Sequence, residues 1–546
     1  MSGSTKYEIV EGKAKLYFDG EKEAFYNPVQ EFNRDLTITV LRQFVKDKED
    51  KSKKDEECPP SKKAKNEDNQ SVGISILDAL SASGLRALRF AQEVPNVEKI
   101  VANDFSNNAV EIIKRNIELN NVTDIVTPHY GDAIDCMMKH RSVSKRFSAI
   151  DLDPYGSASI FLDSAVQSVQ DGGILMVTCT DMAVLCGNTP ETCFLKYNSI
   201  PLKHKSCHEM ALRILLRSID SHANKYGRYI TPLLSCSIDF YVRVFVRIDT
   251  SQKEAKTSVR KLGNVFTCSG CHSFNFQNIV MHNKTEKGER YKAPSFNTSF
   301  INENGRCQQC DSIFHVGGPL YLGPIHDMEF VKRLLLQLKN LPTEKELGTH
   351  RRLEGFLSLI SEELVDVPLY YDHDQLMNTV KCPVPKHSVL KSAILNAGFR
   401  VSQVHTSPTA IKTDCPQVIL WDIIRSIALK NNVTIDKFSN EHPGRKIIMK
   451  KIENEINFDL HPQANNITID KFSNEHPGRK IIMKKIENEI NFDLHPQAVA
   501  TSKKLDLLRF QCNKGKNWGP KQKAKGSVNN IRAGFLKEAT DNCSTD

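Results

Sequence analysis

The stretch Asp-Leu-Asp-Pro-Tyr-Gly, residues 151–156, follows an apolar run that includes Phe147, Ala149 and Ile150. This order predicts a buried strand that ends in two carboxylates, a rigid proline and an aromatic ring. Such a turn can hold a flat base that carries an amine, because the ring stacks on the base and a carboxylate or carbonyl accepts the amine hydrogen. If a methyl-donor pocket lies beside it, the stretch indicates a base N-methyltransferase.

Around this stretch, from residue 74 to residue 248, apolar strands alternate with amphipathic helices. Strands are predicted at 74–77, 100–102, 147–152 and 174–177, with one long strand at 237–248. Helices are predicted through 85–90, 110–117 and 210–219, where apolar residues recur at helical spacing. The alternation predicts an α/β fold built on a mostly parallel, doubly wound sheet.

Three predicted strand ends carry groups suited to an adenosyl ligand, since ligands of doubly wound sheets bind at the carboxyl ends of the strands. The first is the small-residue turn at 78–86, which lacks the several glycines of a dinucleotide fingerprint. Asp104 follows the second strand, where an acid would bind ribose hydroxyls, and Asp132 with Ala133 follows a further strand that precedes the one at 147–152. Each feature alone fits a structural role, but their order along the chain favours a ligand pocket.

Composition limits the class of protein. The 546 residues are 40% hydrophobic and 25% charged, which fits a soluble globular protein of two to four domains. No apolar run approaches the ~20 residues needed to span a bilayer, so no membrane association is expected. The net charge of +9 permits nucleic-acid binding without requiring it. The 15 cysteines, an odd number with no signal-peptide pattern at residues 1–18, favour a reducing compartment.

Two C-x-x-C pairs predict a metal centre: Cys268 with Cys271, and Cys307 with Cys310. Four thiolates at this spacing can close on one tetrahedral Zn²⁺, and a full set of protein ligands makes the site structural. The 35 residues between the pairs exceed the usual ribbon spacing, so a long excursion must leave the site and return. A redox dithiol is the alternative, and His272 and His315 are candidate replacement ligands.

Residues 46–70 contain eight lysines and eight acidic residues, with no aromatic or branched aliphatic side chain. Such a segment buries too little surface to offset the entropy of ordering, so a disordered insertion is predicted. Within it, residues 59–65 (Pro-Pro-Ser-Lys-Lys-Ala-Lys) are similar to a short nuclear-import signal, and a solvated charge run explains them equally well.

Residues 431–464 are repeated at 465–498, and the two blocks differ only at Val433 and Ile467. Folded arrays have about three or more diverged units, so a recent duplication or an assembly error is the better interpretation. We expect one copy to fold and the other to loop out. Residues 499–526 then carry eight basic residues and one acid around Trp518, which suits a phosphate backbone, although a solvated tail is the alternative.

Taken together, these motifs resemble the tRNA guanosine-26 N2-dimethyltransferase family. The matching segments are 25–28, 33–35, 81–86, 151–156, 178–181, 239–245, 317–320, His405 with 412–414, and 517–520. The resemblance implies S-adenosylmethionine as donor, tRNA as partner, and one or two methyl groups placed on the exocyclic N2 amine of guanosine 26. It also implies that the donor pocket includes Arg34, Arg86, Asp104, Asp132 and Ala133.

The resulting domain scheme has a class I, Rossmann-like methyltransferase sheet, a small zinc-binding insertion and a second, α+β domain at the C-terminal end. The boundaries are an N-terminal segment of the catalytic domain at 1–45, the insertion at 46–70, the methyltransferase domain at 71–259, the cysteine segment at 260–330, a tRNA-binding domain at 331–526 and a tail at 527–546. The nucleus is the expected location, with the mitochondrion or cytoplasm as alternatives, and no obligate protein partner is evident.

In this scheme Asp153 accepts a hydrogen bond from the amine and Tyr155 stacks on the flipped base. Asp181, after the next strand, is either a second contact or a helix cap. Two other functions remain open from the residues alone. One is methylation of a different base amine, such as adenine N6, and the other is a catalytically silent RNA-binding protein that keeps the fold.

Overall fold

The computed structural model describes residues 6–19, 26–57, 73–286, 288–342, 346–450 and 495–511. A seven-stranded sheet forms its centre, with strand order β5-β4-β3-β6-β7-β9-β8. Its strands are β3 (Ile74–Asp78), β4 (Val97–Asp104), β5 (Val126–Tyr130), β6 (Phe147–Leu152), β7 (Val169–Cys179), β8 (Arg228–Ile238) and β9 (Tyr241–Thr250). The first five run parallel, and β9 runs antiparallel to both of its neighbours. The predicted α/β sheet is confirmed.

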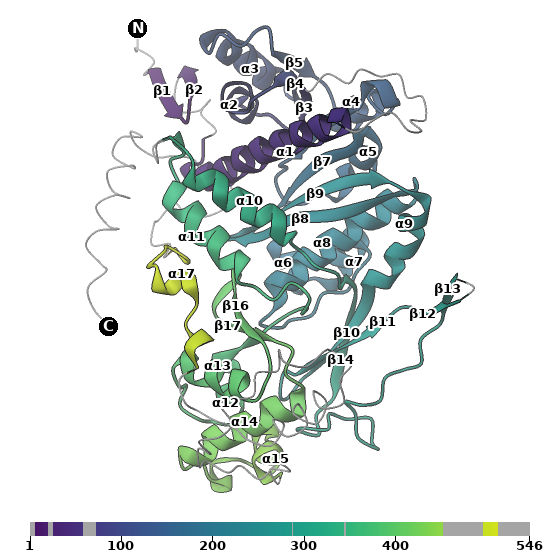
Figure 1. Cartoon of the computed structure of the whole chain (residues 1–546), viewed down its shortest axis with the longest axis vertical. Helices are drawn as coiled ribbons and strands as arrows, with labels where there is room; N and C mark the ends of the chain where they lie inside the picture. Colours follow the sequence, from purple (N-terminus) through teal and green to yellow (C-terminus); the bar gives the residue numbers. More distant parts are fainter. Residues whose placement is uncertain are drawn as a thin grey trace.

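Helices cover both faces of the sheet (Figure 1). One face packs against α2 (Leu85–Glu93) and α3 (Asn107–Leu119), together with α1, α10 and α11, described below. The other face packs against α4 (Ala133–Lys139), α5 (Leu162–Ser168), α6 (Met182–Leu185), α7 (Pro190–Tyr197) and α8 (Cys207–Asn224). The short α9 (Gln252–Thr257) follows β9. The inner strands of the sheet are thus covered on both faces, which explains why they read as apolar runs.

The strand predicted at 237–248 is in fact the end of β8, a two-residue turn and most of β9. Ile238 pairs with Tyr241, so Asp239 and Phe240 form the turn, and Asp239 has a φ of 49°. Aspartate tolerates this left-handed conformation better than most residues, which allows the chain to reverse inside an apolar run.

The N-terminal hairpin of β1 (Lys6–Glu11) and β2 (Ala14–Asp19) leads into the long helix α1 (Glu31–Glu57). The prediction of disorder from residue 46 is wrong for residues 46–57, because α1 continues through them. Its apolar first half is buried, so the helix is already nucleated when it reaches the lysine- and glutamate-rich part, where these residues have good helix propensity. Asp47 also pairs with Arg333 of α10 at 3.0 Å. The import-like residues 59–65 lie outside the described residues.

Beyond the main sheet, the cysteine segment forms a three-stranded sheet of order β11-β10-β14 and a separate hairpin. The strands are β10 (Leu262–Cys268), β11 (Phe274–Asn278) and β14 (Phe314–Tyr321), and the hairpin is β12 (Met281–Thr285) with β13 (Gly288–Lys292). The hairpin lies in the long excursion between the two cysteine pairs.

The C-terminal part has two regions. Helices α10 (Met328–Lys339) and α11 (His350–Ser361) pack on α1 and share the core of the main sheet, so residue 330 is not a break in packing. Next comes an α+β unit with β15 (Tyr371–Asp372), β16 (Val401–Val404), β17 (Ser407–Thr413), α12 (His373–Thr379), α13 (His387–Asn396), α14 (Gln417–Lys430) and α15 (Pro443–Met449).

The chain is next described at residues 495–511, which include α17 (Thr501–Lys504). Most of the second repeat and Trp518 lie outside the described residues. Among the helices of the described ranges, none has the length and apolar character to cross a membrane.

Candidate active site and metal centre

The carboxyl ends of the parallel strands meet at one edge of the sheet, and the turn after β6 lies there. Gly156 N donates to Thr180 Oγ1 and Thr180 N donates to the Gly156 carbonyl, both at 2.8 Å. The turn is therefore fixed to the segment that follows β7. Within it the Asp153 side chain is 23% exposed and Tyr155 is 61% exposed, so both can be reached by a ligand.

Arg86, at the start of α2, joins the predicted donor pocket to the predicted catalytic turn. One of its amino groups pairs with Asp153, and the other lies 3.3 Å from Asp151 Oδ2. Asp151 is fully buried and also accepts a hydrogen bond of 2.7 Å from Arg243, which in turn donates to Thr178 at 2.7 Å. A carboxylate and guanidinium network therefore fixes the base of the site.

The network sets the charge of the groups at the edge. Burial alone would raise the pKa of Asp153, but Arg86 and Arg243 outweigh it and hold that pKa below its usual range. Burial, with help from Asp153 and Asp104, raises the pKa of Tyr155 to about 12. Asp153 is therefore an ionised acceptor and Tyr155 a neutral phenol near pH 7. The same electrostatic contacts place Tyr155 close to both acids.

Asp104, at the end of β4, supports the loop after β3. Its carboxylate accepts hydrogen bonds from the backbone N–H groups of Ala82 and Ser106, both at 2.9 Å. The loop ends at Gly84, whose φ of 82° favours glycine and which leads directly into α2. Asp104 is 8% exposed and still has lone pairs for a ligand.

Asp132 and Ala133 begin α4, directly after β5. Asp132 Oδ1 accepts from Ile134 N at 2.7 Å and from Asp135 N at 3.3 Å, as the capping residue of the helix. Both bonds use one oxygen, which leaves Oδ2 available for the amine of an adenine. Ala133 is buried and Asp132 is exposed. The carboxylate oxygens at these strand ends can therefore accept hydrogen bonds from an adenosyl group.

Arg34 of α1 is buried and tied to Glu11 of β1, with Nε 2.6 Å from Oε1. Burial would raise the pKa of Glu11, but Arg34 and Arg89 lower it to about 2. Repulsion from the positive charge of Arg86 slightly opposes the rise in the pKa of Arg34, which indicates that the two guanidinium groups are near neighbours. Sequence reasoning missed Glu11, whose partner lies 23 residues away and carries no local signal.

Asp181 occupies the predicted N-cap position of α6, where its carbonyl accepts hydrogen bonds from the N–H groups of Val184 and Leu185, but its side chain makes no capping bond. Its carboxylate instead accepts a hydrogen bond of 2.9 Å from the Tyr197 hydroxyl and pairs with Lys196 at 3.2 Å. The Tyr197 hydroxyl also lies 2.7 Å from Ser157 Oγ, next to the catalytic turn. Tyr197 was missed because an apolar helix position at residue 197 gives no sign of this contact.

The four predicted cysteines meet in the core. Cys268 Sγ lies 3.3 Å from Cys310 Sγ, Cys271 Sγ lies 3.6 Å from Cys307 Sγ, and all four sulfurs lie within 4.8 Å of one another. Tetrahedral Zn²⁺ with bonds of about 2.3 Å would separate sulfurs by about 3.8 Å. The four sulfurs could therefore hold one such ion after small shifts.

The two cysteine pairs also have the same backbone shape. In each, the N–H of the first cysteine donates a 2.8 Å hydrogen bond to the carbonyl of the residue five positions later. The bonds run from Cys268 to Ser273 and from Cys307 to Ser312. In each, the residue after the second cysteine has a left-handed φ, 59° at His272 and 61° at Asp311. Such matched turns direct all four sulfurs to one point.

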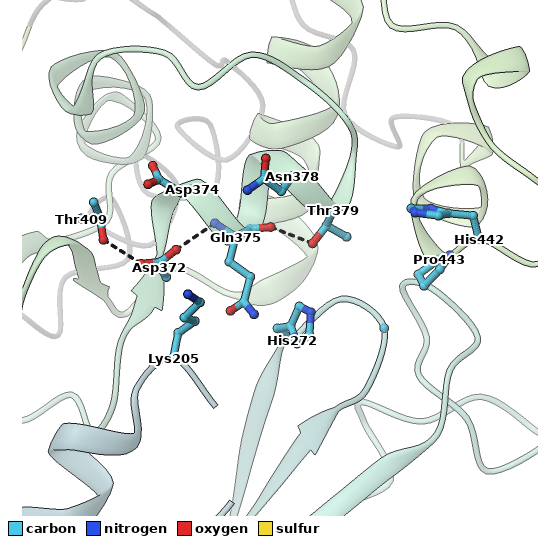
Figure 2. Close-up of a pocket in the computed structure, with 11 residues that line it drawn as sticks. Lys205, His272, Asp372, Asp374, Gln375, Asn378, Thr379, Thr409, His442 and Pro443 are labelled. Carbon is cyan, nitrogen blue, oxygen red and sulfur yellow. Dashed lines mark hydrogen bonds between the residues drawn. The ribbon is translucent and has the colours of Figure 1, made fainter. Parts of the chain in front are cut away.

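A polar cavity of about 580 Å³ lies elsewhere, between the cysteine segment and the α+β unit (Figure 2). Gln375, Asn378 and Thr379 of α12 line it together with Lys205 and His272. His442 and Pro443, at the start of α15, also line it. None of the residues at the sheet edge lines this cavity.

An acid, a proline and an aromatic ring at the carboxyl edge of a doubly wound sheet, beside acids at successive strand ends, are the features of a nucleic-acid base methyltransferase. The comparisons specify the family. The chain belongs to the N2,N2-dimethylguanosine tRNA methyltransferase family, whose model matches residues 3–425.

A Caenorhabditis elegans tRNA (guanine(26)-N(2))-dimethyltransferase is 52% identical over 96% of this chain and 94% of its own length. A Saccharomyces cerevisiae relative with the same name, qualified as mitochondrial, is 34% identical over 94% of this chain and 91% of its own. A solved complex of Trm1 from Pyrococcus horikoshii with S-adenosyl-L-methionine is 29% identical, with a TM-score of 0.61 over 76% of this chain and 99% of that chain. The predicted family resemblance is confirmed.

Proposed function

We propose that this protein transfers one or two methyl groups from S-adenosylmethionine to the exocyclic N2 amine of guanosine 26 in tRNA. The observation that carries the proposal is the 52% identity to the C. elegans enzyme over 96% of the chain. The base-holding turn and the strand-end acids described above supply the chemistry that this activity needs.

The bound sulfonium would supply an electrophilic methyl group, so the protein's main task is to align the amine with it. The guanine amine is a poor nucleophile, because its lone pair is delocalised into the ring. Asp153, kept ionised by Arg86 and Arg243, accepts a hydrogen bond from the amine and stabilises the positive charge that develops on it. Tyr155, neutral and exposed, stacks on the flipped base.

The donor is assigned to the groups at the strand ends. Asp104 would hold the ribose hydroxyls and Asp132 Oδ2 the adenine amine, with Ala133 against the adenine ring. Arg86 and Arg34 would contribute positive charge at the other end of the ligand, near its carboxylate. The support for this assignment is that Asp104, Asp132 and Ala133 follow neighbouring parallel strands of the sheet, and that Arg86 pairs with Asp153 in the turn after β6.

Structural Zn²⁺ is proposed at Cys268, Cys271, Cys307 and Cys310. Four buried thiol groups within 4.8 Å of one another, in two matched turns, support a metal site over a redox dithiol. With four protein ligands the ion would have no open position for water, so it would brace the fold and take no part in methyl transfer.

We assign tRNA binding to the α+β unit and the basic residues 499–526. The polar cavity in Figure 2 supports this, because its amide groups and histidines, together with the carboxylates of Asp372 and Asp374, are groups that can contact ribose and base edges. We also propose the nucleus as one location, on the import-like residues 59–65. The mitochondrial name of the S. cerevisiae relative supports a second location.

The reaction is tested by incubating the purified protein with S-adenosylmethionine and two tRNA transcripts, one with guanosine 26 and one with adenosine 26. Mass spectrometry of the digested nucleosides should find N2-methylguanosine and N2,N2-dimethylguanosine only from the first. Methyladenosine would instead indicate the adenine N6 reaction. Absence of any product, with tRNA still bound, would indicate a silent RNA-binding protein.

A further inference from the structure

A second group of metal-ligating side chains lies apart from the four-cysteine site. Cys186, Cys207 and His208 each offer one ligand atom, and these three atoms all lie within 4.8 Å of one another. All three side chains are partly exposed, so an ion could enter from solvent. Both cysteines are free thiols. Two sulfurs and an imidazole are a ligand set that favours Zn²⁺ over the harder Mg²⁺ and Ca²⁺.

The backbone around these residues is well ordered by its own contacts. Cys186 ends α6, where its N–H donates to the Met182 carbonyl at 2.8 Å. Cys207 and His208 are the first two residues of α8, and the N-terminus of a helix favours negative charge. His208 Nδ1 lies 2.9 Å from Ser237 Oγ, an outer contact of the kind that orients metal-bound histidines.

The segment that leads into β15 contacts the chain just before α8. The Tyr370 hydroxyl donates to the Lys205 carbonyl at 3.0 Å, two residues before Cys207. The group thus lies where α6, α8 and the segment leading into β15 come together.

We infer that Cys186, Cys207 and His208 form a second metal site, which takes one Zn²⁺ with a fourth position open to water or an external ligand. With three protein ligands it binds more weakly than the four-cysteine site, so it responds to the free metal concentration. Occupancy ties the end of α6 to the start of α8. Since α6 starts directly after Asp181, the metal restrains the helix that adjoins the Asp181–Tyr197 contact.

The test compares the full-length protein with a Cys186→Ser/Cys207→Ser double variant, and with Cys382→Ser as a control that removes an unrelated buried thiol. Each protein, fully reduced, is equilibrated with chelator-buffered Zn²⁺, and bound zinc per chain is counted by elemental mass spectrometry. The wild type and the control should bind one more ion than the double variant. His208→Ala should weaken that ion's binding at least tenfold.

Co²⁺ provides an independent readout, because the thiolate-to-cobalt absorption at saturating Co²⁺ should be weaker in the double variant than in the wild type. Equal zinc counts in the wild type and the double variant would overturn the inference. So would a mass spectrum in which Cys186 and Cys207 are joined by a disulfide and the reduced protein binds no additional metal. The difference in zinc count does not depend on the four-cysteine site or on methyl transfer, so failure here leaves the proposed function untouched.

Discussion

At the residue scale, the sequence could locate the groups that chemistry needs but not the partners that set their charge. Asp104, Asp153 and Tyr155 follow apolar runs, and strand ends could be read from that pattern. The ion pairs were not readable, because Arg86 meets Asp153 across 67 residues. The roles of these residues stay predictions. Their neighbours explain why Asp153 is ionised near pH 7 and why Tyr155 is not.

Asp78 is the residue whose environment makes the clearest pH prediction. Burial first, then repulsion from Asp151, raises its pKa from 3.8 to about 7. The folded state therefore binds a proton more tightly than the unfolded state, and this stability is fully present below about pH 4 and lost as the pH rises through 7. Asp78→Asn mimics the protonated form, so it should match the wild type at pH 4.

At pH 8 the Asp78→Asn variant should be more stable than the wild type, by at most about 4 kcal/mol for a shift of this size. Chemical denaturation of both proteins at each pH checks this, and their difference removes the contribution of other carboxyls. Two parallel curves of unfolding free energy against pH would show that Asp78 does not titrate in this range.

At the element scale, the positions of β3, β4, β6 and β7 were predicted because inner strands that are buried on both faces give apolar runs. The edge strand β5 received no range, since its exposed residues interrupt such a run, and most of β8 was missed. Two further errors, in where an element ends, arose because hydrophobicity alone does not show a tight turn or the continuation of a helix. The run at 237–248 contains a reversal at Asp239, and the charged stretch after residue 46 continues a helix that had already formed. The sequence pattern identified elements but misplaced two of their ends.

Arg243 of β9 connects several elements at once. It bonds Asp151 of β6 and Thr178 of β7 at 2.7 Å, and Thr37 of α1 at 3.0 Å. Arg243→Gln should lower the free energy of unfolding by up to about 3–5 kcal/mol, because it leaves the buried Asp151 carboxylate with only the longer, 3.3 Å pair to Arg86. Arg247→Gln, on the same strand, is the control: this pair with Asp249 is partly exposed and should cost about 1 kcal/mol or less. Equal losses in denaturant unfolding would refute the network's structural role.

At the scale of the whole molecule, the predicted α+β unit is present, but residue 330 does not separate two cores. The four cysteines belong to a core cluster that includes residues of both the main sheet and the α+β unit. Sequence patterns reveal elements one by one, whereas shared cores depend on contacts between segments hundreds of residues apart. A metal at the cysteines should therefore stabilise more than its own segment.

Cys307→Ser, or removal of zinc by a chelator, should lower the unfolding free energy by a few kcal/mol, since metal binding is linked to folding. Donor affinity, measured by calorimetry below the unfolding temperature, should stay within a few-fold of the wild type. A protein that contains no zinc as purified and melts unchanged after Cys307→Ser would rule out a structural metal.

Deletion of residues 465–498 should leave methylation near the wild-type level. His495 N donates to Ser392 Oγ at 2.8 Å, and the first copy carries the same His-Pro-Gln-Ala sequence at 461–464, which can take that place after the deletion. Nucleoside analysis of treated tRNA and a melting curve check the outcome. An unfolded or inactive product would show that both copies are needed.

The most direct measurement of the central claim compares wild type, Asp153→Asn and Asp153→Ala in a single-turnover methyl-transfer assay on guanosine-26 tRNA, with donor affinity measured by calorimetry. The account predicts a rate loss of about a hundredfold or more in both variants, as for loss of a preorganised charge-stabilising group, while the donor still binds. Wild-type rates of dimethylguanosine formation in Asp153→Ala would contradict it.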